Sequence, residues 1–318
     1  MRVLVTGGAG FIGSHLVDRL LGLGHQVICY DNLATGQIAN LNHHLTHPHF
    51  KMVIDSVLNR IELGDQVENC DLVVHLAADV GLTNVVENPV ETLMTNVRGA
   101  VNVLQAAFKH HKKVVMASSS EVYGKNINGP LNEEDDLILG STKVFRWSYS
   151  SAKIVNEQFA MAFADKGLEV VCVRIFNTYG PRINEDSVLN VFIQQALAGQ
   201  DLTISGDGKQ KRCFAYVSDI VDGLYKAALE CPRCDGEVIN LGSTDEYDIE
   251  DVAQRIKQLT GSNSKLTYGH PWLDNTQRRV PDVNKAKRLL GFKPSTSFDQ
   301  GLAATVAWVK EKGRRVLV

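Results

Sequence analysis

The stretch RVLVTGGAGFIGSHLVDRLLGL, residues 2–23, decides the fold of this chain. Residues 2–6 form a short apolar run with several β-branched side chains, which predicts a buried strand. From residue 11 to residue 23, apolar side chains recur at helical spacing. Gly7, Gly10 and Gly13 lie between these segments, and the absence of side chains there permits a tight turn. The stretch therefore predicts a strand, a glycine turn and a helix.

Strands and helices continue to alternate through the first half of the chain. Parallel strands need long crossover connections between them, and these crossovers are almost always right-handed. We therefore predict an α/β fold with a doubly wound parallel sheet, of the Rossmann type, and helices on both faces. The remaining predicted strands are at 27–30, 72–76, 114–117 and 169–175, and the predicted helices are at 89–108 and 149–165.

The composition of the sequence changes after residue 175, where predicted loops rich in Asn, Gly and Pro begin. We predict a cofactor-binding domain at residues 1–176 and a smaller, mixed α/β substrate lobe at 177–318. Residues 214–229 have the pattern of a strand followed by a helix. The segment at about 213–242 is therefore predicted to return to the first domain.

The composition is that of a globular protein. Hydrophobic residues make up 44% of the 318 residues and charged residues 22%, with a net charge of −3. The chain has no dense run of Lys and Arg, which argues against a nucleic-acid partner. No apolar stretch approaches the roughly 20 residues of a membrane span. The first strand leaves no room for a secretion signal, so we expect a cytoplasmic protein.

Neither the cysteines nor the histidines predict a metal site. The six cysteines show no regular framework, so reduced thiols are expected. Cys231 and Cys234 form a CxxC pair without a second pair, which favours the end of a helix over a zinc ligand set. The histidine-rich stretch at 42–50 is spaced irregularly, and we interpret it as a solvated loop.

The glycine turn is a candidate cofactor site. Its glycines permit close approach of a pyrophosphate, and the N-terminus of the following helix attracts anions. A plain strand-to-helix turn would need the same residues, so the context matters. The second strand ends at Asp31 and Asn32, about 20 residues further on, where a carboxylate suits the ribose hydroxyls of NAD. Asp31 would repel a 2′-phosphate, so NAD is preferred over NADP.

Two further segments follow in the expected order. Asp55 closes the third strand, where it either accepts a hydrogen bond from the adenine amino group or caps a helix. Leu76, Ala77 and Ala78 follow the fourth strand, and their modest size lets a cofactor lie flat.

Tyr149 and Lys153 are the candidate catalytic pair. Their spacing of four residues places both on one face of the predicted helix. A surface pair could have this spacing, but SSSEVYG at 118–124 follows the fifth strand, where open α/β sheets place their sites. A hydroxyl, a phenol and an amine are therefore predicted to converge.

TGGAGFIG, Asp31, SSSEVYG and YSSAK together resemble the extended short-chain dehydrogenase/reductase family of nucleotide-sugar epimerases, dehydratases and decarboxylases. The resemblance covers nearly the whole chain. RIFNTYGPR at 174–182, GDGKQKRCFAYVSDIVDG at 206–223 and RRVPDVNKAKRLLGFKP at 278–294 are similar to its nucleotide-binding segments. The cofactor contacts that we predict are Gly7, Gly10, Phe11, Ile12, Gly13, Asp31, Asn32, Asp55, Leu76, Ala77, Ala78, Asn96, Tyr149 and Lys153.

The resemblance implies that Tyr149 takes a proton from a sugar hydroxyl, usually at C4, while a hydride passes to NAD. Lowering the pKa of the phenol to about 7 requires roughly 4 kcal/mol, which Lys153 and the oxidised nicotinamide would supply. Ser119 aligns with the hydroxyl that holds the reacting oxygen.

Three more residues align with substrate contacts in the family. Asn177 aligns with a substrate-contacting amide, and Arg212 and Arg279 align with residues that meet the diphosphate or the sugar. Without the aligned motifs, a surface ion pair would be the preferred interpretation of either arginine.

Ser120 and Glu121 bear on the choice of reaction. Dehydratases of the dTDP-glucose type carry an Asp-Glu pair here, whereas UDP-glucuronate decarboxylases resemble the Ser-Glu of this chain, as do GDP-mannose dehydratases. ILGSTKVFRWSYSSAK at 138–153, NPVETLMTN at 88–96 and Arg279 before Val-Pro also resemble decarboxylases. ADVGLTNVVE at 78–87 departs from the Pro-rich stretch of the simple decarboxylases near the sugar.

Decarboxylation of UDP-glucuronate is our first prediction. Glu121, Ser120 and Arg279 would then handle the carboxylate and the reprotonation at C5. The alternatives are a 4-epimerase of a UDP-hexose or UDP-uronate, a nucleotide-sugar 4,6-dehydratase and, least favoured, a non-catalytic NAD-binding regulator. The resemblance also implies a homodimer through the helices at 89–108 and 149–165, although their apolar residues could instead cover the sheet.

Overall fold

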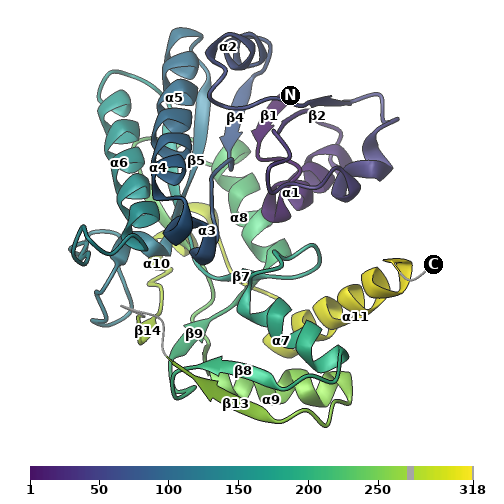
Figure 1. Ribbon diagram of the computed structural model, residues 1–318. Helices are drawn as coiled ribbons and strands as arrows, with labels where there is room; N and C mark the ends of the chain where they lie inside the picture. The colour runs from purple at the N-terminus through teal and green to yellow at the C-terminus, as the bar shows by residue number, and fades with distance from the viewer. Residues whose placement is uncertain (271–275, 317–318) are drawn as a thin grey trace.

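A parallel sheet of seven strands forms the centre of the larger lobe (Figure 1). The computed structural model describes residues 1–270 and 276–316. The strand order β11-β6-β5-β4-β1-β2-β3 reverses between β4 and β1, which is the point where open α/β sheets bind their ligands. The strands are β1 (Arg2–Thr6), β2 (Gln26–Tyr30), β3 (Phe50–Val53), β4 (Leu72–His75), β5 (Lys113–Ser119), β6 (Val170–Ile175) and β11 (Val238–Leu241).

Helices cover both faces of this sheet because the side chains of each strand alternate between two cores. In β1, Val3 and Val5 enter one core and Leu4 enters the other. The first core lies under α1 (Phe11–Gly22), α8 (Val217–Leu229) and α10 (Asn284–Leu290), and the second under α2 (Arg60–Glu68), α5 (Gly99–Lys109) and α6 (Trp147–Ala164). The prediction of a doubly wound α/β sheet is confirmed.

The long helix predicted at 89–108 is interrupted. It consists of α4 (Pro89–Leu93), a turn of π-helix at Met94–Arg98 and α5, and the short helix α3 (Leu82–Glu87) precedes it. Asn96, inside the π turn, accepts from the backbone N–H of Asp79 at 2.8 Å and donates to the carbonyl of Asp79 at 2.9 Å. The π turn therefore fixes the chain just after β4, beside the open end of the sheet.

The smaller lobe has its own apolar core. Phe298 stacks on Tyr247 and Phe214 at ring-centroid distances of 4.3 and 5.6 Å. Its helices are α7 (Val188–Leu197), α9 (Ile249–Thr260) and α11 (Phe298–Val316). Its strands are the parallel pair β8 (Leu202–Ser205) and β13 (Leu266–Gly269), the group β9 (Lys211–Cys213), β12 (Glu246–Asp248) and β14 (Arg278–Arg279), and the pair β7 (Thr178–Tyr179) and β10 (Ala215–Tyr216).

The chain passes between the lobes several times. After β10 it enters α8 and then β11, which pairs with β6 at the edge of the large sheet. Later it forms α10, which packs against α8 and β11. The division at residue 176 stays a prediction. No helix in the described part of the chain combines the length and apolarity that crossing a membrane requires.

Two predictions, of reduced thiols and of a histidine-rich loop, are each wrong for part of their residues. Cys231 and Cys234 form a disulfide, because the turn after α8 brings their Cα atoms to 5.6 Å, a separation that a disulfide spans. The thiols of the other four cysteines are free and buried. The start of the histidine-rich stretch is not a loop, since it ends a turn of 3-10 helix, η1 (Ile38–His44).

A buried ion pair joins α6 to β6. The guanidinium of Arg174 donates to both carboxylate oxygens of Glu157, at 2.9 and 2.8 Å, and the Ser118 hydroxyl donates to the same carboxylate at 2.5 Å. The side chains of Arg174 and Glu157 are only 5% and 8% exposed. The contact fixes the helix that carries Tyr149 and Lys153 against the strand beside it.

We expect His75 to lower the stability of the protein as the pH falls. Its buried ring lies 2.7 Å from Thr6 Oγ1, and burial, with a smaller effect of the Lys153 charge, lowers its pKa to about 3. Below about pH 6.5 the unfolded chain binds a proton that the folded protein does not. The free energy of unfolding should therefore fall by about 1.4 kcal/mol per pH unit between about pH 6 and pH 4.

Urea unfolding at a series of pH values measures this effect. His75→Gln should lose that part of the pH dependence, whereas His49→Gln, at an exposed position, should keep the slope of the wild type. Equal slopes for the wild type and His75→Gln would contradict the assignment.

Candidate active site

A cavity of about 550 Å³ opens at the carboxyl ends of the sheet strands. Strands β1, β2, β4, β5 and β6 all end at this cavity, as the switch in strand order predicts. It brings together the five predicted catalytic residues, Asn177 and all but one of the predicted cofactor contacts. The predicted residues that line it are Gly7, Gly10, Phe11, Ile12, Gly13, Asp31, Asn32, Asp55, Leu76, Ala77, Ala78, Ser119, Ser120, Glu121, Tyr149, Lys153 and Asn177.

The glycine turn has no room for side chains. Gly7 has a φ of +71°, and a Cβ atom there would lie 2.6 Å from the backbone N of Ala77. A Cβ atom on Gly13 would lie 2.1 Å from the carbonyl oxygen of Gly7. Gly10 is the N-cap of α1, so no side chain covers the first N–H groups of that helix. This cradle fits the pyrophosphate of a dinucleotide.

Asp31 lies at the end of β2 with its carboxylate at the cavity. Its two oxygens accept from the backbone N–H groups of Ala9, at 2.9 Å, and Leu33, at 2.8 Å. Burial raises the pKa of this carboxyl, and the two hydrogen bonds oppose the shift. These contacts hold the carboxylate beside the glycine turn, where it can accept hydrogen bonds from ribose hydroxyls. The residues therefore fit NAD.

Two predicted cofactor residues have other roles as well. Asp55 lines the cavity, but the alternative that it caps a helix is wrong, because Asn59 caps α2 and donates to Asp55 at 2.7 Å. Asn96 is buried and is not among the cavity-lining residues. Its amide holds the backbone of Asp79, which does line the cavity, so its contribution to the site is indirect.

Tyr149 and Lys153 face the cavity from the first turns of α6. Lys153 Nζ lies 5.7 Å from the centroid of the Tyr149 ring and donates to the carbonyl of Ala117 at 2.7 Å. Burial lowers the pKa of Lys153 to about 8. Burial raises the pKa of Tyr149 well above its usual value, and a hydrogen bond with Ser119 offsets this only in part. The protein side chains alone therefore do not bring the phenol to a pKa near 7.

Three arginines surround Glu121. Arg279 bonds one carboxylate oxygen of Glu121, and Arg146 lies 3.4 Å from the other. Despite burial, which opposes the shift, the charges of Arg279 and Arg146 lower the pKa of Glu121, so the carboxyl is ionised. Burial and the charges of Arg279 and Arg146 lower the pKa of Arg212 to about 10. Three positive charges thus meet one negative charge beside the cavity.

Only part of this cluster was predicted from the sequence. Arg212 and Arg279 are not among the cavity-lining residues. They act on the site through their charges on Glu121, which does line the cavity. Arg146 was not predicted, although it lies three residues before Tyr149 in a stretch that resembles decarboxylases. Asp79, Val80, Thr95 and Asn184 also line the cavity without having been predicted. Their signal was weak because Asp79, Val80 and Asn184 lie in irregular segments and Thr95 lies in the π turn.

A phenol and an ammonium on one helix line the same cavity as a glycine turn that fits a dinucleotide. Such a site can remove the proton of a hydroxyl group while a hydride leaves the carbon that bears it. This is the chemistry of NAD-dependent short-chain dehydrogenases/reductases. Within that class, the chain belongs to the NAD dependent epimerase/dehydratase family, whose model matches residues 3–242. The predictions of the family, of an enzyme and of NAD as its cofactor are confirmed.

Relatives and solved structures match almost the whole chain. UDP-N-acetyl-alpha-D-glucosaminuronate decarboxylase of Bacillus cytotoxicus is 43% identical over 98% of this chain and 98% of that protein. UDP-glucuronic acid decarboxylase 1 of Xenopus tropicalis is 39% identical over 98% of this chain and 72% of that protein. The structure of a UDP-glucuronic acid 4-epimerase from Bacillus cereus, with UDP-glucuronic acid and NAD, has a TM-score of 0.90 at 30% identity and covers 98% of this chain and 100% of that one.

Proposed function

We propose that this enzyme oxidises a UDP-linked hexuronate at C4 and removes its carboxyl group, with the 2-acetamido sugar acid as the preferred substrate. The arginine cluster around Glu121 is the observation that carries the proposal. Guanidinium groups bind carboxylates and phosphates in paired hydrogen bonds. The buried Nε of Arg279 has no hydrogen-bond partner among the described residues, so one donor of the cluster is left unused beside the cavity.

Each catalytic side chain then has a defined task. Tyr149 accepts the proton of the C4 hydroxyl, and Ser119 holds the reacting oxygen in line with it. Lys153 stabilises the phenolate through its positive charge. Bound along the glycine turn, NAD supplies the hydride acceptor and later the hydride donor at C4. The C4 ketone makes the substrate a β-keto acid, whose C5–carboxyl electron pair passes toward the ketone as CO2 leaves. A proton must then be added at C5.

Glu121 positions an arginine in this scheme. A carboxyl that is ionised and paired with Arg279 is a poor proton donor for C5. Its charge instead holds the Arg279 guanidinium beside the cavity, where it can meet the sugar carboxylate. Ser120 is buried, lines the cavity and precedes Glu121 in the chain, so its hydroxyl is the remaining candidate for contact with the sugar carboxylate.

The preference for the 2-acetamido sugar rests on two observations. The relative named for that sugar is more similar to this chain than the UDP-glucuronic acid decarboxylase, and it matches over nearly its full length. In addition, residues 78–87 depart from the sequence of simple UDP-glucuronate decarboxylases, and Asp79 and Val80 from this segment line the cavity. Different cavity-lining side chains in this segment would suit a sugar with a different substituent.

Mass spectrometry of the products tests the proposal. The full-length protein is incubated with NAD and either UDP-N-acetylglucosaminuronate or UDP-glucuronate. We expect loss of CO2 from both, with the higher kcat/KM for the 2-acetamido substrate. A new isomer of unchanged mass would instead make the enzyme an epimerase, and loss of water would make it a dehydratase. If neither substrate changes, the proposed substrate class is wrong.

We also propose a cytoplasmic homodimer formed through α4, the π turn and α6. The predicted alternative, that the apolar residues of these helices cover the sheet, accounts for only some of them. Val90, Met94 and Phe159 are 64%, 46% and 39% exposed, respectively. Light scattering that gives the mass of one chain would contradict the dimer.

A further inference from the structure

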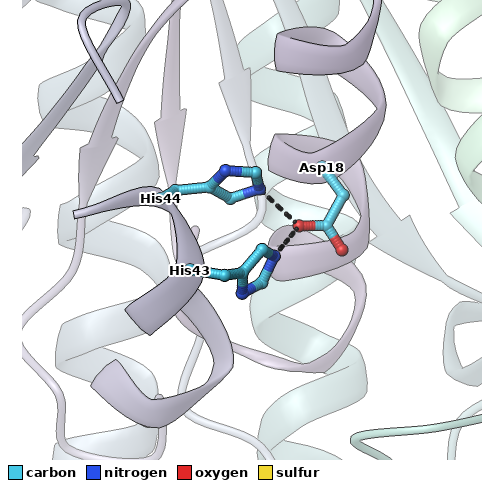
Figure 2. Close-up of side chains that lie close together, drawn as sticks. All are labelled: Asp18, His43 and His44. Carbon is cyan, nitrogen blue, oxygen red and sulfur yellow. Dashed lines mark hydrogen bonds and ion pairs between the residues drawn. The ribbon is translucent and has the colours of Figure 1, made fainter. Parts of the chain in front are cut away.

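Two histidines and an aspartate from different elements converge on the outer side of α1 (Figure 2). His43 and His44 end η1, and Asp18 lies in the middle of α1. The Nε2 atoms of His43 and His44 lie 2.9 and 2.8 Å from the same oxygen, Oδ1 of Asp18. His43 and His44 are the last two residues of this turn, and both rings reach the same oxygen although consecutive side chains on a helix point at least about 100° apart.

This donor set suits a borderline divalent cation. Two imidazole nitrogens and one carboxylate oxygen are ligands of Zn²⁺ and of similar transition-metal ions, and three protein ligands leave room for water. Bonds of about 2.0–2.2 Å in tetrahedral geometry place ligand atoms roughly 3.3–3.6 Å apart. Each imidazole Nε2 therefore has to move away from Oδ1 of Asp18 by roughly 0.4–0.8 Å. We propose that Asp18, His43 and His44 form a binding site for Zn²⁺ or a chemically similar divalent cation, separate from the active site.

The surroundings of the three side chains favour such a site. Arg182 bonds the other oxygen of Asp18, Oδ2, at 2.8 Å. It therefore orients the carboxylate and leaves Oδ1 to the imidazoles, as outer-shell partners of metal sites do. The side chain of His44 is 15% exposed and that of Asp18 is 30% exposed, while His43 is 51% exposed. The ligands are thus partly sheltered, and the ion can enter from the side of His43.

A cation here would connect η1 to the helix that follows the glycine turn. The segment around η1 already contacts that turn, because the backbone N–H of Gln37 and the side-chain amide of Asn40 both donate to the carbonyl of Ala9, at 3.0 and 2.9 Å. Ala9 in turn donates to Asp31 at 2.9 Å. Metal binding would therefore reduce the opening of a segment that packs on the cofactor turn.

Titration of the full-length, tag-free protein with Zn²⁺ tests the proposal. The wild type should bind one equivalent at this site. His43→Ala, His44→Ala and Asp18→Asn should each weaken that binding by at least about 10- to 100-fold, since loss of a direct ligand costs no less than loss of an outer-shell partner. His49→Ala is the matched control, because it removes a histidine of the same segment whose ring packs edge-on against His47. It should bind Zn²⁺ as the wild type does.

Two further measurements do not depend on enzyme activity. Co²⁺ in place of Zn²⁺ should give visible absorption bands in the wild type and in His49→Ala but not in His43→Ala. Zn²⁺ should also slow amide hydrogen exchange at residues 37–44 in the wild type and not in His43→Ala, provided that both proteins show the same circular dichroism spectrum. Equal Zn²⁺ affinity in all variants, or no uptake by the wild type, would overturn the proposal and leave the cluster as a plain hydrogen-bonded contact.

Discussion

Replacement of Tyr149 by phenylalanine is expected to lower kcat by about 10²- to 10⁴-fold, the range that general acid–base catalysis contributes. The change removes one oxygen from a half-buried ring that lines the cavity beside Ser119 and Lys153. Without that oxygen, no side chain in the proposed scheme accepts the proton of the C4 hydroxyl. Single-turnover measurement of NADH absorbance, with a UDP-hexuronate as substrate, follows the oxidation step directly.

A second tyrosine provides the control for this experiment. Tyr123 is fully buried, its hydroxyl donates to Asn240 at 2.8 Å, and it does not line the cavity. Tyr123→Phe should lower stability and leave kcat of the folded enzyme within about threefold of the wild type. Titration with NAD should show that Tyr149→Phe still binds the cofactor, because the glycine turn and Asp31 are unchanged. A kcat for Tyr149→Phe close to that of Tyr123→Phe would rule out the phenol as the base.

Glu157→Gln is expected to lower the free energy of unfolding by about 3–5 kcal/mol. The change keeps the size of the side chain but removes the charge that pairs with Arg174, which is left positive and buried. Denaturation in guanidinium chloride, followed by circular dichroism, measures the loss. The variant should also lose activity through displacement of α6, which holds Tyr149 and Lys153.

An exposed pair and a double variant complete this test. The side chain of Glu185, which contacts Lys312, is 79% exposed. Glu185→Gln breaks this contact and should lower the free energy of unfolding by less than about 1 kcal/mol. Glu157→Leu combined with Arg174→Met removes both charges and should recover much of the stability lost in Glu157→Gln. A loss below about 1 kcal/mol in Glu157→Gln would mean that the pair does not hold α6 to β6.

The sheet and its helices were predictable because their periodicities differ. The predicted strand at 169–175 and helix at 149–165 match β6 and α6 to within two residues. The π turn was not predictable, because it is accompanied by contacts between Asn96 and the backbone of Asp79, which lies 17 residues away. A helical pattern in the sequence does not show such contacts, and neither does it show that Cys231 and Cys234 meet.

The site divides in the same way. The glycine turn, Asp31 and the pair Tyr149 and Lys153 were predictable because each is set by local spacing next to a strand or helix. The charge cluster was predictable only in part: the family resemblance placed Glu121 and Arg279 at the site, but Arg146 joins them only through the tertiary fold. The pKa of Tyr149 also depends on burial, which no spacing of residues reveals.

The edge position of β11 determines how this protein can be divided or recombined. A fragment that ends at residue 176 would leave the N–H and C=O groups on one side of β6 unpaired and would remove the apolar cover that α8 gives α1. Unprotected strand edges recruit other chains, so the fragment would aggregate. A chimaera that takes its smaller lobe from a relative must therefore retain both residues 217–241 and α10 of this chain, with donor sequence joined around them.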